Sequence, residues 1–149
     1  MTSAPTLATQ TQSTTSERTD GTDRAWVRPW LRAEGLATFA AGLAGFLLLG
    51  LPWWAFVLLL IVPDVSMVGY LRGPRVGAFV YNVGHDLLTG VAIAGVGLTI
   101  GSAPVTAAGA ILVAHSGMDR MAGYGLKLPG SFKDTHLGRI GTAAKAGRP

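Results

Sequence analysis

The sequence predicts an all-α fold, a four-helix transmembrane bundle made of two helical hairpins. The mean hydropathy is +0.40 and only 13% of the residues are charged, a composition typical of membrane proteins. No Asp, Glu, Lys or Arg occurs in residues 35–63 or 87–118. Each run is too long for one helical crossing of a hydrocarbon core about 30 Å thick. Turn residues at 50–52 and 101–104 divide the two runs, so each predicts a pair of helices.

Polar tails are expected on both sides of this membrane domain. Residues 1–22 are rich in Thr, Ser and Gln and predict a disordered tail, without an apolar run typical of a cleaved signal. The membrane domain covers 23–141, and a basic tail covers 142–149. The helices are expected at about 32–50, 52–71, 76–100 and 104–122.

Small side chains recur every four residues on two of these helices. Ala37, Ala41 and Gly45 share one face of helix 32–50, and Gly90 and Ala94 share one face of helix 76–100. Small residues at this spacing let helix backbones approach closely in lipid. We therefore expect both faces to contact neighbouring helices.

A short amphipathic helix is expected after the last membrane helix. Ser131 and Asp134 form a capping-box pattern that could start a helix reaching Ile140. Phe132, His136 and Ile140 would then share one face. His136 is a candidate lid over the cytoplasmic mouth of the bundle, or else a surface histidine beside lipid headgroups.

The distribution of basic residues predicts the orientation in the membrane. All 12 lie in 18–32, at 72–75 or in 120–148, and neither opposite turn contains one. The positive-inside rule then predicts a multi-pass protein of the inner (plasma) membrane with both termini cytoplasmic. Trp53 and Trp54 lie where an outer aromatic belt is expected. The net charge of +4 fits a cytoplasmic rim, so the expected partner is the lipid bilayer and not nucleic acid.

Several ionisable side chains lie within or at the ends of the apolar segments. They are Glu34, Asp64, Asp86, Asp119, His85 and His115. A charge near the bilayer centre costs at least about 2.5–3.5 kcal/mol, so such groups usually face a bundle interior or a wet cavity. Counted from the outer turns at about 1.5 Å per residue, Asp64 and His115 lie about 16–18 Å deep. Asp119, Asp86 and His85 lie about 22–24 Å deep, in the same cytoplasmic half.

One interpretation of this cluster is a site for a divalent metal ion. Asp64, His85, His115 and Asp119 would supply two imidazoles and two carboxylates from three helices, a donor set suited to zinc, manganese or iron. Such an ion could activate water for hydrolysis. Asp86 would then act as a base or support a ligand. Arg120 or Arg72 would anchor an anion.

Two other interpretations use the same side chains without a metal ion. In one, the histidines and acids form a hydrogen-bonded network that fixes helix packing. In the other, they carry protons or ions across the membrane. Whether the protein is an enzyme therefore stays open at this point. The absence of cysteine excludes disulfides, thiol catalysis and thiolate metal sites, and no P-loop, dinucleotide fingerprint or nucleophile elbow occurs.

Five short motifs occur in order along the chain: Pro63–Met67, Tyr81–His85, His115–Arg120, Gly123–Lys127 and Phe132–Gly138. Together they resemble the domain of unknown function 4260 family over about residues 33–141. The resemblance implies a small integral membrane protein and no assigned activity.

A looser similarity links the chain to bacterial membrane-bound metal-dependent hydrolases. The matching positions are Asp64, which follows Pro63, then His85, His115 and Asp119. Those proteins usually carry further acids after the first Asp and a second histidine near the middle one. This chain has Val65–Ser66 and Asp86 there instead, so the resemblance implies at most part of their metal site.

Overall fold

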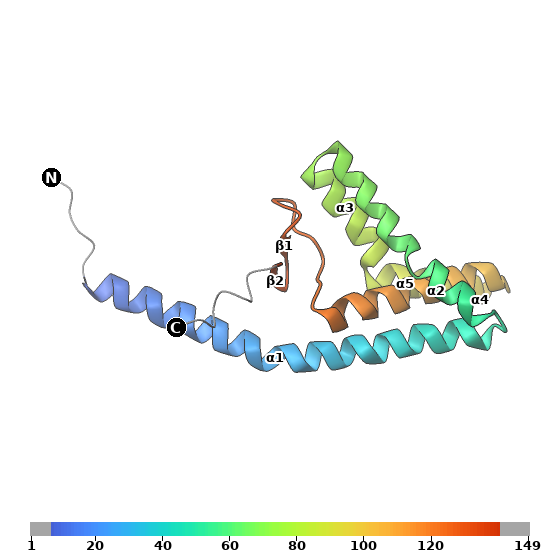
Figure 1. Cartoon of the computed structure of the whole chain (residues 1–149), viewed down its shortest axis with the longest axis horizontal. Helices are drawn as coiled ribbons and strands as arrows, with labels where there is room; N and C mark the ends of the chain where they lie inside the picture. Colours follow the sequence, from blue (N-terminus) through green and yellow to red (C-terminus); the bar gives the residue numbers. More distant parts are fainter. Residues whose placement is uncertain (1–6, 141–149) are drawn as a thin grey trace.

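The computed structural model describes residues 7–140, and the predicted basic tail at 142–149 lies outside the described residues. Helices account for most of the described chain (Figure 1). They are α1 (Leu7–Leu48), α2 (Trp53–Leu59), the 3₁₀ helix η1 (Val62–Arg72), α3 (Pro74–His85), α4 (Leu87–Thr99) and α5 (Ala103–Ala122). Two very short strands, β1 (Asp134–Thr135) and β2 (Gly138–Arg139), pair antiparallel near the C-terminus.

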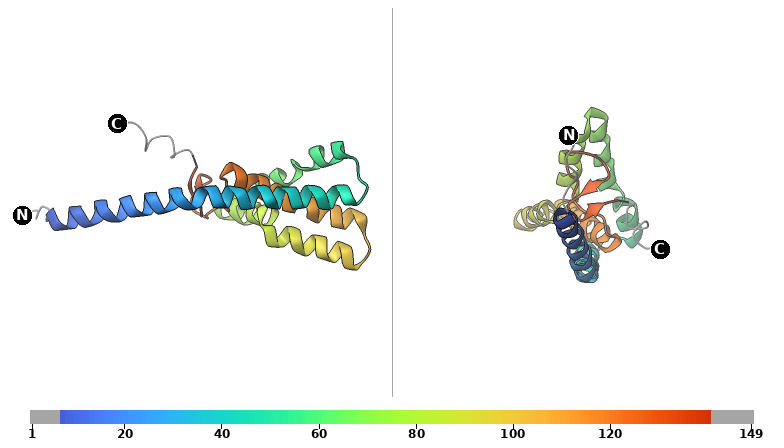
Figure 2. Two further views of the ribbon diagram at one scale, coloured as in Figure 1. Left: turned by 90° about the horizontal axis from the view of Figure 1, so that it is seen from below. Right: turned by 90° about the vertical axis from the view of Figure 1, so that its left-hand side faces the viewer.

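Helix α5 lies between α1 and α4 and packs closely on both (Figures 1 and 2). On the α1 side the contact is made at glycines, since a Cβ on Gly42 would lie 2.5 Å from the backbone nitrogen of Ala114. Gly35 faces the backbone of α5 in the same way. Of the predicted face, Ala37 and Ala41 are exposed, whereas a Cβ on Gly45 would lie 3.8 Å from the Ala110 Cβ of α5. The helix turns Gly35 and Gly42, seven residues apart, toward α5 more closely.

The predicted small-residue face of α4 does contact its neighbour. A Cβ on Gly90 would lie 2.9 Å from the backbone nitrogen of Val113. Gly109 of α5 has no room for a Cβ beside the backbone of Ala94. Close backbone approach therefore determines both interfaces of α5.

A small aromatic core closes the end of the bundle beside the turn at 50–52. Phe46 of α1 and Phe56 of α2 meet edge to face with ring centroids 5.5 Å apart. Small residues of α5 complete the cluster with Ile111. The core anchors α2 beside α1 and α5.

The predicted helix 52–71 is interrupted between α2 and η1. Pro63 has no amide hydrogen, and the N–H of Asp64 donates to the carbonyl of Ile61 at 3.1 Å, a 3₁₀ bond. An α-helix would have used the carbonyl of Leu60 for that bond. The break therefore frees the Leu60 carbonyl toward the bundle interior.

The predicted helix 76–100 is divided into α3 and α4, which are bent by 49°. Asp86 lies at the break in an extended conformation (φ −83°, ψ 133°), and its side chain accepts a hydrogen bond from the Thr89 N–H at 3.2 Å. Asp is a favoured N-cap residue, so it starts α4 anew. As a result, η1 and α3 form a hairpin that diverges from α1 and α5 (Figure 1).

The expectation of a helix from Ser131 to Ile140 is wrong. Ser131 accepts a hydrogen bond on its hydroxyl from the Lys133 N–H at 3.3 Å, and its carbonyl accepts one from the Asp134 N–H at 3.0 Å. These local bonds form a turn in place of a helix cap. The chain then makes the β1–β2 hairpin, and Thr135 also bridges to Lys127.

The N-terminal segment also differs from the expected disordered tail. Helix α1 begins at Leu7, and residues 1–6 lie outside the described residues. Adding residues to an existing helix avoids the cost of nucleation, which explains how a polar stretch continues the apolar helix behind it.

Two helical segments are long and apolar enough to cross a membrane, and the bent α3–α4 pair would make a third. The two are 26–48 and 53–72, with mean hydropathies of 1.3 and 1.9. Exposed tryptophans flank them, including Trp26 at 73% and Trp53 at 71% exposure. Within residues 7–140, α5 does not qualify as a span by composition, because it carries the polar side chains of the bundle interior.

Candidate metal centre

The four predicted ligands meet where the η1–α3 hairpin diverges from α5. Asp64 comes from the first turn of η1, His85 from the end of α3, and His115 and Asp119 from successive turns of α5. One ligand atom each of Asp64, His85 and His115 can be chosen so that all three lie within 4.8 Å of one another. The helices thus place these three donors where one metal ion could contact them all.

The imidazole Nε2 atoms face the two carboxylates. Oδ1 of Asp64 lies 3.4 Å from Nε2 of His85 and 3.6 Å from Nε2 of His115. Oxygens of Asp119 lie 3.9 Å from Nε2 of His85 and 4.0 Å from Nε2 of His115. Both carboxylates therefore approach both imidazoles, Asp64 through one oxygen and Asp119 through a different oxygen for each ring.

Backbone carbonyls define the tautomer of both histidines. Nδ1 of His85 lies 2.9 Å from the carbonyl oxygen of Tyr81, and Nδ1 of His115 lies 2.7 Å from that of Leu60. A carbonyl can only accept, so we assign the proton to Nδ1 in each ring. In each ring, Nε2 is then the nitrogen that faces the cluster.

His115 is the most constrained of the four. Its side chain is 1% exposed, and within the described part of the chain its Nε2 atom has no hydrogen-bond partner. A buried polar atom without a partner costs about 1–3 kcal/mol. A metal ion bonded to Nε2 would remove that cost, so the donor set fits a metal ion.

The carboxylates provide the access to the cluster. The side chain of Asp64 is 39% exposed and that of Asp119 is 18% exposed, whereas His85 is 2% exposed. The two imidazoles are therefore buried, and the cluster is open to solvent on the side of the carboxylates.

Two side chains that were not predicted as site residues hold the ligands. The hydroxyl of Tyr81 donates to Oδ2 of Asp119 at 2.8 Å, and its ring stacks on His85 with centroids 3.7 Å apart. The hydroxyl of Ser116 donates to the carbonyl of His85 at 2.6 Å. The i, i+4 spacing of Tyr81 and His85 was the available sequence signal.

The segment after α5 returns to α3 and adds a buried cation. Asn82 exchanges two hydrogen bonds with the backbone of Lys127, at 2.9 and 2.7 Å. The Lys127 ammonium donates to the Phe132 carbonyl at 3.0 Å and lies over the rings of Phe132 and Tyr81, 4.1 and 5.1 Å from their centroids. Burial lowers the pKa of Lys127, and the charge of Asp119 opposes this shift. Nothing in the local sequence predicted a buried lysine.

The other predicted site residues lie apart from the ligand atoms. Asp86 caps α4 through Thr89, so its carboxylate has a structural partner. Glu34 is exposed on α1. Arg72 is exposed in the last turn of η1.

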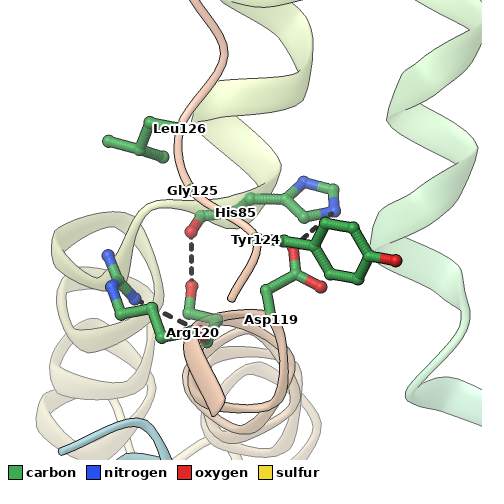
Figure 3. A pocket seen from close by; sticks show the side chains of 7 residues that line it. His85, Asp119, Arg120, Tyr124, Gly125 and Leu126 are labelled. Carbon is green, nitrogen blue, oxygen red and sulfur yellow. Dashed lines mark hydrogen bonds and ion pairs between the residues drawn. The ribbon is translucent and has the colours of Figure 1, made fainter. Parts of the chain in front are cut away.

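Arg120 and His136 lie on the side of the cluster where α5 ends. Arg120 lines a small pocket and points a nitrogen at the Ser116 carbonyl, 3.4 Å away (Figure 3). The pocket is also lined by His85, Ser116, Asp119, Tyr124, Gly125 and Leu126. His136 accepts a hydrogen bond on Nδ1 from the Leu126 N–H at 2.9 Å, so it supports one wall of this pocket.

Comparison with known proteins places the chain in one family. Neither the curated proteins nor the solved structures contain a match to it. The profile of a family described as a domain of unknown function (DUF4260) matches residues 28–140, which include every helix that contributes a ligand. The chain belongs to the DUF4260 family.

Proposed function

We propose that this is a four-span membrane protein that binds one divalent metal ion through Asp64, His85, His115 and Asp119. One observation carries the proposal: both histidines donate Nδ1–H to backbone carbonyls and direct Nε2 toward two carboxylates. Metal-binding histidines usually make such an outer hydrogen bond, which orients the ring. Nε2 of His115 is buried and has no hydrogen-bond partner among residues 7–140, and a bound ion would supply that partner.

The proposal includes the membrane topology. Helix α5 would cross the bilayer as the interior helix, shielded by α1 and α4, so its low hydropathy is no obstacle. Both termini would be cytoplasmic, because the turns at 50–52 and 101–104 contain no basic residue. Reporter fusions test this arrangement: activity typical of the outer compartment at the C-terminus would contradict it.

The donor set indicates which metal ions the site would take. Two imidazoles and two carboxylates suit zinc, manganese or iron better than calcium or magnesium, which prefer oxygen ligands. A bound ion of this kind could lower the pKa of a water molecule and supply hydroxide for hydrolysis. The adjoining pocket contains Arg120, a group suited to an anionic substrate. Hydrolase-like chemistry is therefore part of the proposal.

A non-catalytic role is the competing proposal. If Nε2 of His85 also carries a proton, its 3.4 Å contact with Asp64 could serve as an interhelical hydrogen bond or as a step in a proton path. Interhelical hydrogen bonds in membranes contribute only about 0.6 kcal/mol on average. This role predicts that chelators do not affect the stability of the protein.

Metal analysis of the full-length protein, purified in detergent without chelator, decides between the two roles. We expect about one metal ion per chain in wild type and a loss of metal in His115→Ala. Thr106→Ala is the matched control, because it removes a hydrogen bond of a buried side chain on the same helix, nine positions before His115 and away from every ligand. A wild-type protein that is free of metal and takes up neither added zinc, manganese nor iron would overturn the metal proposal.

A further inference from the structure

We infer that Tyr81 is a positioning residue for the metal ion, and that Lys127 in the segment after α5 holds Tyr81 in place. This inference rests on the proposed metal site. It gives the segment after α5 a role in metal affinity, although that segment supplies no ligand.

The Tyr81 hydroxyl determines how Asp119 faces the histidines. It donates to Oδ2 at 2.8 Å, which leaves Oδ1 turned toward Nε2 of His115, 4.0 Å away. A carboxylate whose second oxygen is already hydrogen-bonded has lost most of its rotational freedom. Binding a metal ion then requires less ordering of the side chain.

The ring of Tyr81 restrains a second ligand. It stacks on His85 at a centroid distance of 3.7 Å and an interplanar angle of 13°. Tyr81 is only 3% exposed, so neither ring has room to turn aside. One side chain therefore restrains two of the four ligands, and these two ligands lie on different helices.

Lys127 in turn restrains Tyr81. The ammonium lies 5.1 Å from the Tyr81 ring centroid, within the range of a cation–π contact. The backbone of Lys127 is attached to Asn82, the next residue on α3, by two hydrogen bonds. Lys127 is 5% exposed, and its ammonium donates to the Phe132 carbonyl and lies over the rings of Phe132 and Tyr81. These contacts offset part of the cost of burying the ammonium, and they depend on the position of the Tyr81 ring.

Tyr70 is a natural control for the hydroxyl of Tyr81. It lies on η1 with its ring against Gly77 of α3, and its hydroxyl is buried without a hydrogen-bond partner in the described residues. Tyr70→Phe therefore removes the same atom from the same hairpin without disturbing a ligand. Tyr81→Phe keeps the ring on His85 and removes only the hydrogen bond to Asp119.

The experiment titrates the metal-depleted full-length protein with Zn²⁺ against a chromophoric chelator. Removal of an outer hydrogen bond to a ligand typically lowers metal affinity about 10–100-fold. We expect a loss in this range for Tyr81→Phe and a change below about twofold for Tyr70→Phe. Lys127→Met keeps the apolar stem and removes the charge, and we expect it to weaken binding in the same direction.

A double-mutant comparison separates positioning from general loss of structure. If Tyr81 acts through Asp119, Tyr81→Phe should cause no further loss of affinity in an Asp119→Ala background. The visible spectrum of the Co²⁺ form should also change in Tyr81→Phe and not in Tyr70→Phe. Equal losses in both backgrounds, or wild-type affinity and spectrum in Tyr81→Phe, would overturn the inference and leave the metal site intact. Failure of wild type itself to bind Zn²⁺, Mn²⁺ or Fe²⁺ would instead overturn the proposed function.

Discussion

Nδ1 of His115 donates a hydrogen bond to the carbonyl oxygen of Leu60 at 2.7 Å, across 55 positions of sequence. That carbonyl is available because the helical hydrogen-bond pattern changes between α2 and η1, immediately before Pro63. The same break begins η1, which carries Asp64. One interruption of a membrane helix thus orients a histidine and presents a carboxylate to it.

Substitutions of Asp86 test whether its carboxylate caps a helix or acts in the metal site. Asn caps helices as well as Asp does, so Asp86→Asn should keep wild-type stability. Asp86→Ala removes the acceptor for the Thr89 N–H and should lose about 0.5–2 kcal/mol of unfolding free energy. Both variants should retain bound metal. Metal content and thermal unfolding in detergent are measured for both variants. Loss of metal in Asp86→Asn would instead support the sequence-based hypothesis that this carboxylate takes part in the metal site.

Much of the site could be predicted because helical geometry relates sequence spacing to depth and direction. Asp64, His85, His115 and Asp119 fall at similar depths on inward faces, and the structure brings them together. The breaks on either side of the cluster were harder to foresee. Apolar runs show where a chain can be helical, but a carbonyl released by Pro63 or an Asp86 cap depends on local hydrogen bonding that hydropathy does not report.

The segment after α5 shows the limit of local patterns. Ser131 and Asp134 fit a capping box, yet the chain forms a hairpin there, and Thr135 bridges to Lys127. Lys127 in turn is bound by Asn82 of α3. These are contacts between distant parts of the sequence, and a four-residue signature contains no information about them.

Packing of α5 against α1 predicts that alanine at Gly42 and alanine at Gly95 have different effects on stability. A Cβ on Gly42 would lie 2.5 Å from the Ala114 nitrogen, whereas nothing lies within 4 Å of a Cβ on Gly95. Gly42→Ala should therefore lose about 1–3 kcal/mol of unfolding free energy through overpacking, despite the better helix propensity of Ala. Gly95→Ala should leave stability unchanged or raise it. Unfolding by a denaturing detergent measures both, and equal stability of the two variants would contradict this helix interface.

Because Lys127 is buried, it predicts how the stability of the folded protein changes with pH. The pKa of Lys127 is lowered from its ordinary value of 10.5, mainly by burial, with the charge of Asp119 acting in the opposite direction. The other titratable group that faces the ammonium is Tyr81. Below the lowered pKa, the folded protein bears the full cost of burying the charge. Between that pKa and 10.5 the unfolded chain binds more protons than the folded one, so stability due to this group rises with pH.

Lys127→Met isolates this contribution, because the other groups titrate in both proteins. The melting temperature of wild type minus that of Lys127→Met should be constant at neutral pH. It should then increase as the pH approaches 10.5, the ordinary pKa of lysine. Thermal unfolding in detergent, recorded in chelator so that metal binding does not contribute, provides the measurement. A difference that stays constant or decreases as the pH rises would mean that the folded protein stabilises the charged ammonium, and that burial is not the dominant influence on Lys127.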